Sequence, residues 1–179
     1  MRTPRERLLE IIRLGALLLL AIALQAVFTS RFTVLGVTAD VFLIFPVLVG
    51  MSRGSLVGAV FGFVSGLLAD VIFMDPIGLR TLIYLLVGYL SGRYAEWMPP
   101  YSAWVVVALT AVATLLGQST YAIFQFITGN KAPFLSMIWR QVLPAAAVNG
   151  LLVAPLYLGL ARLKLVSRLE PGPRRERMG

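Results

Sequence analysis

The sequence predicts an all-α integral membrane protein with six transmembrane helices and both termini in the cytoplasm. The chain is 59% hydrophobic and 13% charged, with a mean hydropathy of +0.86. Soluble domains are only about 45–50% apolar and about 25% charged. The apolar residues fall into six runs. If each run crosses the bilayer once, most of the Lys and Arg residues lie on one side of the membrane. These observations together predict the fold class.

The runs span residues 14–28, 37–51, 55–73, 78–92, 101–128 and 134–163. The first follows a basic segment and resembles a signal peptide, but no cleavage site follows it, so we interpret it as a retained span. The second is short and contains Pro46, which fits either a complete but broken span or a re-entrant segment. The others approach the roughly 20 residues that a helix needs to cross a bilayer core.

The distribution of basic residues favours six crossings. With the N-terminus inside, the outer side carries four Lys and Arg and the cytoplasmic side carries twelve. The outer four are Arg31, Arg80, Lys131 and Arg140; the inner twelve are Arg2, Arg5, Arg7, Arg13, Arg53, Arg93, Arg162, Lys164, Arg168, Arg174, Arg175 and Arg177. If the second run did not cross, the division would become about even, against the positive-inside rule. We therefore expect one six-helix domain over residues 1–165 and a basic cytoplasmic tail over 166–179, which also contacts membrane lipid.

The composition argues against catalysis, metal binding and nucleic-acid binding. The chain has no Cys and no His, which removes thiolate sites, the commonest metal ligand and the usual general base. We expect no catalytic residue, no metal and no cofactor. The net charge of +8 follows the membrane topology and forms no stripe for nucleic acid.

The third and fourth runs form a hairpin that contains three charged residues. Asp75, Pro76 and Gly78 are typical of a turn, with Asp75 expected to cap the fourth span. Asp70 and Arg80 lie five residues before and after Asp75, which places them at a similar depth. Because an isolated charge in a bilayer is costly, we predict that Asp70 and Arg80 form an ion pair across the hairpin.

A glycine ridge runs along the third span, where small residues recur every four positions: Gly54, Gly58, Gly62 and Gly66. Small residues let helix backbones approach closely in lipid. The ridge therefore predicts either packing within the bundle or a contact face for a partner subunit.

A polar face on the fifth span includes Thr114, Gln118 and Gln125, and the sixth span carries Asn149 near mid-membrane. Polar side chains at helical spacing in lipid must face protein or water. This pattern predicts interhelical hydrogen bonds, a ligand cavity or a groove for a partner.

The hairpin "GFVSGLLADVIFMDPIGLRTLIYLLVGYLSG" resembles the central segment of the MreD family of bacterial rod shape-determining membrane proteins. That family has a Gly-rich span ending in Asp, then a turn ending in Gly with an Arg two residues later. Asp70, Gly78 and Arg80 occupy these places, and the "VNG" that contains Asn149 also matches. The turn departs from the family because Phe73, Met74 and Asp75 replace small polar residues.

The resemblance implies a non-enzymatic scaffold of the cell-elongation complex in the bacterial cytoplasmic membrane. Its implied partners are MreC, cytoplasmic MreB filaments, and RodA with its penicillin-binding partner. The family fold is similar to the substrate-binding subunits of energy-coupling-factor vitamin transporters, which supplies the alternative function. Those subunits carry two small residues four positions apart on span one. In this chain the residues four positions after Gly15 and Ala16 are leucines. An ion-coupled transporter would need midplane acidic residues that the sequence lacks.

Overall fold

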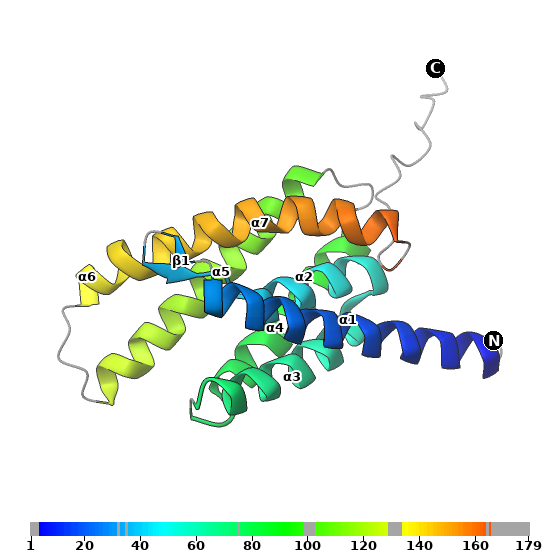
Figure 1. The fold of residues 1–179 in the computed structure, drawn as a ribbon, viewed down its shortest axis with the longest axis horizontal. Coiled ribbons are helices and arrows are strands. Elements are labelled where there is room, and N and C mark those ends of the chain that lie inside the picture. The colour runs from blue at the N-terminus through cyan, green and yellow to red at the C-terminus, as the bar shows by residue number, and fades with distance from the viewer. Residues whose placement is uncertain are drawn as a thin grey trace, which may run out of the picture.

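The computed structural model describes residues 4–31, 33–34, 36–74, 76–98, 103–128, 134–163 and 165. Its elements are α1 (Pro4–Arg31), β1 (Thr33–Val34), β2 (Val37–Thr38), α2 (Val41–Arg53), α3 (Ser55–Ile72), α4 (Leu79–Trp97), α5 (Ala103–Ile127), α6 (Phe134–Met137), a π-helical turn η1 (Ile138–Val142) and α7 (Leu143–Arg162). The helices run alternately up and down one bundle, with the start of α1 and the end of α7 at the same end (Figure 1). The opposite end holds the β1–β2 hairpin, the α3–α4 connection and α6, and we call it the hairpin end.

Four helical segments of the described chain are long and apolar enough to cross a membrane: Pro4–Ser30, Ser55–Ile72, Ala103–Ile127 and Ile138–Arg162. The protein is thus all-α with several membrane-spanning helices. The two other predicted spans correspond to α4, which is less apolar, and to α2, which has only 13 residues.

The short helix α2 forms the centre of the core. Every residue from Val41 to Met51 is buried, Pro46 included. A helix that is apolar all round belongs inside a bundle, because it faces protein on every side. Its 13 residues span about 20 Å at about 1.5 Å per residue, well short of a bilayer core of about 30 Å. The antiparallel β1–β2 hairpin precedes it at the hairpin end.

Helix α1 begins about ten residues before the apolar run that predicted it. Pro4 starts the helix, a position that tolerates proline because the first N–H groups have no helical partner. Most of α1 is exposed to the surroundings of the bundle, and Leu17, Ala21 and Gln25 face inward at a spacing of four residues.

The last membrane segment is one continuous helix with a π-helical turn near its start. The Leu143 N–H donates to the Ile138 carbonyl five residues back. Pro144 has no N–H to offer the carbonyl of Arg140, and the wider turn lies directly before this proline. The turn brings Arg140 and Gln141 to the hairpin end of the bundle.

Candidate functional site

Asp70 caps the N-terminus of α4 from the last turn of α3. Its Oδ2 accepts hydrogen bonds from the Gly78 N–H (2.8 Å), the Thr81 N–H (3.2 Å) and the Thr81 hydroxyl (2.7 Å). Its Oδ1 accepts from the Arg80 N–H at 3.0 Å. Gly78, the N-cap residue, has a φ of 107° and no side chain with which to cap. The fully buried Asp70 carboxylate therefore supplies the acceptor that the first turn of α4 requires.

This geometry corrects the predicted ion pair between Asp70 and Arg80. The hairpin does bring the two residues together, but Asp70 binds the backbone N–H of Arg80 and not its guanidinium. The Arg80 guanidinium lies beside Asp40 instead, with Nη1 3.5 Å from Oδ2. The unpaired N–H groups at the start of α4 occupy both oxygens of the short Asp70 carboxylate. The longer Arg80 side chain therefore binds a different carboxylate. The predicted cap Asp75 lies outside the described residues.

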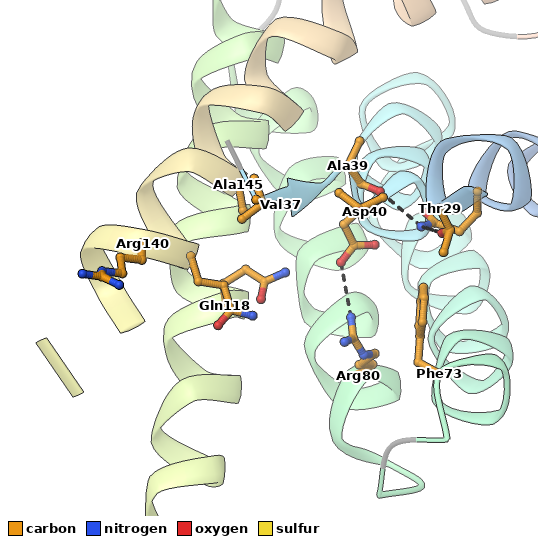
Figure 2. Close-up of a pocket in the computed structure, with 13 residues that line it drawn as sticks. Thr29, Val37, Ala39, Asp40, Phe73, Arg80, Gln118, Arg140 and Ala145 are labelled. Atoms are coloured by element: carbon orange, nitrogen blue, oxygen red, sulfur yellow. Dashed lines mark hydrogen bonds and ion pairs between the residues drawn. The ribbon is translucent and has the colours of Figure 1, made fainter. Parts of the chain in front are cut away.

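Asp40, Arg80 and Tyr84 form the candidate site, which we call the polar cluster. The Tyr84 hydroxyl donates to Asp40 Oδ2 at 2.6 Å, and Arg80 Nη1 donates to the Tyr84 oxygen at 3.2 Å. The side chains of Asp40 and Arg80 are only 7% and 16% exposed. Figure 2 shows Asp40 and Arg80 facing each other between the helices. The carboxylate compensates a guanidinium that would otherwise be a costly charge at this depth.

Two aromatic rings complete the surroundings of Arg80. Its guanidinium carbon lies 4.8 Å from the centre of the Phe73 ring and 4.9 Å from that of Tyr121. Cations at this distance from ring faces are attracted by the ring quadrupole. Arg80 thereby links its own helix, α4, to α5 and to the segment that joins α3 and α4.

Asp40 also joins α2 to the rest of the bundle through its backbone. Its Oδ1 caps α2 by accepting from the Leu43 N–H at 3.1 Å. Its own N–H donates to Asn149 Oδ1 of α7 at 2.9 Å, and Asn149 Nδ2 donates to Thr114 Oγ1 of α5 at 3.1 Å. On the other side, Gln25 of α1 accepts from the Val41 N–H and donates to the Ala39 carbonyl.

The predicted polar face on α5 is divided between two environments. Thr114 and Asn149 bind each other inside the bundle. Gln118 lines a cavity near the polar cluster. Gln125 is half-buried near the end of α5 and is not among the residues that line that cavity.

The glycine ridge on α3 is covered by α4. A Cβ added at Gly58 would collide with the Gly88 carbonyl, and one added at Gly62 would collide with the Tyr84 carbonyl. At Gly66 it would meet the backbone of Thr81 at 2.5 Å. Gly54 differs, because it ends α2 with a φ of 95° before α3 begins. The structure thus assigns the ridge to packing within the bundle.

Glu96 caps α3 from the last turn of α4, in the same way that Asp70 caps α4. Its Oε1 accepts from the Ser55 N–H at 2.7 Å and the Ser55 hydroxyl at 2.8 Å. The N-cap residue of α3, Gly54, has no side chain, so the neighbouring helix again supplies the acceptor. These bonds, the backbone one first, hold the pKa of this exposed carboxyl below its usual value of 4.5.

A cavity of about 420 Å³ opens beside the polar cluster at the hairpin end. Its lining is mainly polar and comes from α1, β2 with the residues around it, the α3–α4 connection, α4, α5, η1 and the start of α7. The lining residues are Gln25, Thr29, Gly36, Val37, Thr38, Ala39, Asp40, Phe73, Arg80, Gln118, Arg140, Gln141 and Ala145.

The sequence reasoning missed Asp40, Tyr84 and Gln25. Within the run at residues 37–51, Asp40 directly precedes the uninterrupted apolar stretch that begins at Val41, which is the usual sign of a helix N-cap. Tyr84 lies four residues after Arg80 and so on the same helix face. Gln25 is an amide within the first apolar run, where lipid offers it no partner.

Comparison with known proteins identifies the family. The model of the family described as rod shape-determining protein MreD matches residues 6–164, which extend from the first turn of α1 to beyond the end of α7. No curated protein and no solved structure gives a significant match. Because the match extends over most of the sequence, the chain belongs to the MreD family of rod shape-determining membrane proteins.

Proposed function

We propose that this protein is a non-enzymatic scaffold of the cell-elongation complex, which binds MreC and links MreB filaments to peptidoglycan synthesis by RodA and its penicillin-binding partner. The observation that carries this proposal is the family match over residues 6–164. The chemistry of the site supports it. The charged groups Asp70, Glu96 and Asp40 each hold a helix N-terminus, and Arg80 is held by a carboxylate and two rings. Such groups fix the shape of a bundle.

The bundle is proposed to lie in the cytoplasmic membrane with both termini inside and the hairpin end outside. The excess of Lys and Arg at the termini supports this orientation. The start of α1 and the end of α7 lie at the same end of the bundle, as they must if the chain crosses the membrane an even number of times.

Complementation and co-purification together test the scaffold. In a rod-shaped bacterium depleted of its own MreD protein, this chain and a compatible MreC are expected to restore rod shape, and MreC is expected to co-purify with the chain in mild detergent. A Gly62→Leu variant is expected to lose both, because the added side chain collides with the α4 backbone. Gly159→Leu is the matched control, since nothing lies within 4 Å of its added Cβ.

Wild-type chain that is stably inserted yet leaves cells round and retains no MreC would refute the proposal. The cavity beside the polar cluster favours one alternative, a substrate-binding subunit of an energy-coupling-factor vitamin transporter. A stoichiometric vitamin in the denatured, purified protein would support that alternative. The scaffold function requires none.

A further inference from the structure

Helix α2 is too short to cross the bilayer, and the missing length falls at the hairpin end. Its 13 residues span about 20 Å of a core that is about 30 Å thick. At its far end, Arg53 binds the Glu10 carboxylate of α1 at 3.5 Å and the Leu165 carbonyl at 3.1 Å, near the end of the bundle where α1 begins and α7 ends. Roughly 10 Å of the bilayer core between Asp40 and the hairpin end is therefore left without α2.

The cavity at the hairpin end lies next to Asp40, where α2 is missing. Its wall includes residues 36–39, which belong to β2 and the segments around it and not to a helix. Non-helical backbone at membrane depth is tolerated only where protein buries it or where it borders a water-filled cavity. The volume of about 420 Å³ has room for on the order of ten water molecules, at about 30 Å³ each.

The cavity offers no net charge to an occupant. Asp40 and Arg80 compensate each other at 3.5 Å. Figure 2 shows the Arg140 side chain turned away from the cavity and from this pair. Small-molecule sites are lined predominantly by apolar and aromatic side chains, whereas this lining is mainly polar. A neutral, mainly polar lining suits water better than an organic ligand.

Gln118 needs a partner that the fold does not supply. It lies on α5, more than two turns before the end of that helix at Ile127. Its amide has no hydrogen bond to any other residue that the structure describes. A polar side chain at this depth must face protein or water. Gln118 lines both the cavity and a second, smaller chamber, so water in these spaces can satisfy its amide.

The smaller chamber has the size and the chemistry of a site for one water molecule. It has a volume of about 10 Å³ and lies between Gln118 and the polar cluster. One water molecule needs roughly 10–15 Å³ for its centre and about two to four polar partners. Five of the eight residues that line the chamber are polar: Asp40, Arg80, Tyr84, Gln118 and Tyr121.

Helix α2 closes these polar spaces on the side away from the hairpin end. Every residue from Val41 to Met51 is buried, and none of them carries a polar side chain. Water that reaches Asp40 from the hairpin end therefore meets a tightly packed apolar helix directly beyond it.

We propose that the cavity is a water-filled vestibule open at the hairpin end, and that the smaller chamber holds one bound water molecule that joins Gln118 to the Asp40–Arg80 pair. The polar cluster is thereby in contact with solvent from one side of the membrane, although it lies among membrane-spanning helices. The vestibule does not depend on MreC binding. Only the side from which the water enters rests on the proposed orientation.

Cysteine accessibility in cells tests the vestibule, since the chain has no native Cys. Gln118→Cys and, as a second position on the wall, Thr38→Cys are treated with small membrane-impermeant methanethiosulfonates, one anionic and one cationic. Leu116→Cys is the matched control, because Leu116 lies on the same helix and is 62% exposed on the outer surface of the bundle, where lipid surrounds it. Thiols react as thiolates, which apolar surroundings disfavour, so we expect both vestibule variants to react at least about tenfold faster than Leu116→Cys.

The outcomes separate the vestibule from the orientation. Reaction of the vestibule variants in intact cells supports a vestibule that opens to the outside. Reaction only after permeabilisation would support the vestibule and contradict the proposed orientation. No reaction in either vestibule variant, or an equal rate in Leu116→Cys, would overturn the vestibule.

Hydroxyl-radical footprinting by X-ray radiolysis of the wild-type chain in detergent tests the bound water, since radicals formed from a bound water oxidise the side chains beside it. Tyr84 lines the chamber and is 1% exposed, whereas Tyr157 of α7 is 6% exposed and lines neither space. We expect Tyr84 to be oxidised at least about threefold faster than Tyr157, because a water partner lies next to it. Exposure alone would give the opposite order. Oxidation of Tyr84 no faster than that of Tyr157 would overturn the bound water.

Discussion

The structure predicts which carboxylate is energetically coupled to Arg80. Asp70 binds the backbone N–H of Arg80, so replacing the Arg80 side chain leaves every hydrogen bond of Asp70 in place. Asp40 binds the guanidinium and loses a partner in the same substitution. Two double-mutant cycles, Asp40→Ala with Arg80→Ala and Asp70→Ala with Arg80→Ala, separate the two arrangements.

The magnitudes follow from the burial of each partner. In Asp70→Ala, the Thr81 N–H and hydroxyl are buried donors left without an acceptor, while the Gly78 and Arg80 N–H groups are closer to water. At about 1–3 kcal/mol for each buried unsatisfied donor, we expect a loss of about 2–6 kcal/mol. The coupling between Asp70 and Arg80 should stay within about 0.5 kcal/mol, whereas that between Asp40 and Arg80 should reach about 1–3 kcal/mol.

The assay is the free energy of unfolding in mixed micelles, followed by tryptophan fluorescence during titration with sodium dodecyl sulfate. Asp70→Asn serves as a further control, since one amide oxygen can still accept the three bonds made to Oδ2, and it should be milder than Asp70→Ala. A strong coupling between Asp70 and Arg80, with none between Asp40 and Arg80, would refute the assignment and restore the ion pair predicted from the sequence.

Three other predictions concern packing, topology and pH. Gly62→Ala should lower the yield of folded protein in detergent, because its Cβ meets the α4 backbone, while Gly159→Ala should not; equal yields would contradict the tight α3–α4 contact. In a chain without native Cys, Ile77→Cys should react with a membrane-impermeant maleimide in intact cells, and Met98→Cys only after permeabilisation; the reverse pattern would invert the proposed orientation. The lowered pKa of Glu96 means that its contribution to stability is complete above its usual value of 4.5 and is lost as the pH falls through the lowered value. Glu96→Gln should flatten this acid dependence of the Tm, and an unchanged dependence would exclude the cap as its origin.

The sequence predicted the helices best where an apolar run ends at a turn signal. The run at residues 55–73 became Ser55–Ile72, and the run at 134–163 became a continuous helix ending at Arg162. In each, a glycine, a proline or a charged residue lies next to the boundary. The end of α1 nearest the N-terminus was missed, because it is polar and hydropathy does not register it.

The pairing of charges could not be predicted because it depends on contacts between distant segments. Asp40 and Arg80 are far apart in the sequence and meet only when α2 packs against α4. Rules based on spacing describe neighbours on one helix or across one turn, and so they favoured Asp70 for Arg80. The chemistry of that local contact was also ambiguous, since a carboxylate near a helix start can bind either a guanidinium or the free backbone N–H groups.

The reciprocal caps on α3 and α4 have a consequence for the order in which the protein is assembled. Both acceptors, both glycine N-caps and the facing glycines lie within residues 54–97, so the caps and the glycine contacts of this pair of helices can form once Trp97 has been synthesised. The N–H of Asp40, by contrast, waits for Asn149, which the ribosome delivers about fifty residues later. The α3–α4 pair can therefore enter the bilayer with both helix N-termini already capped, whereas the N-cap residue of α2 acquires its last hydrogen-bonding partner only when the final helix has been synthesised.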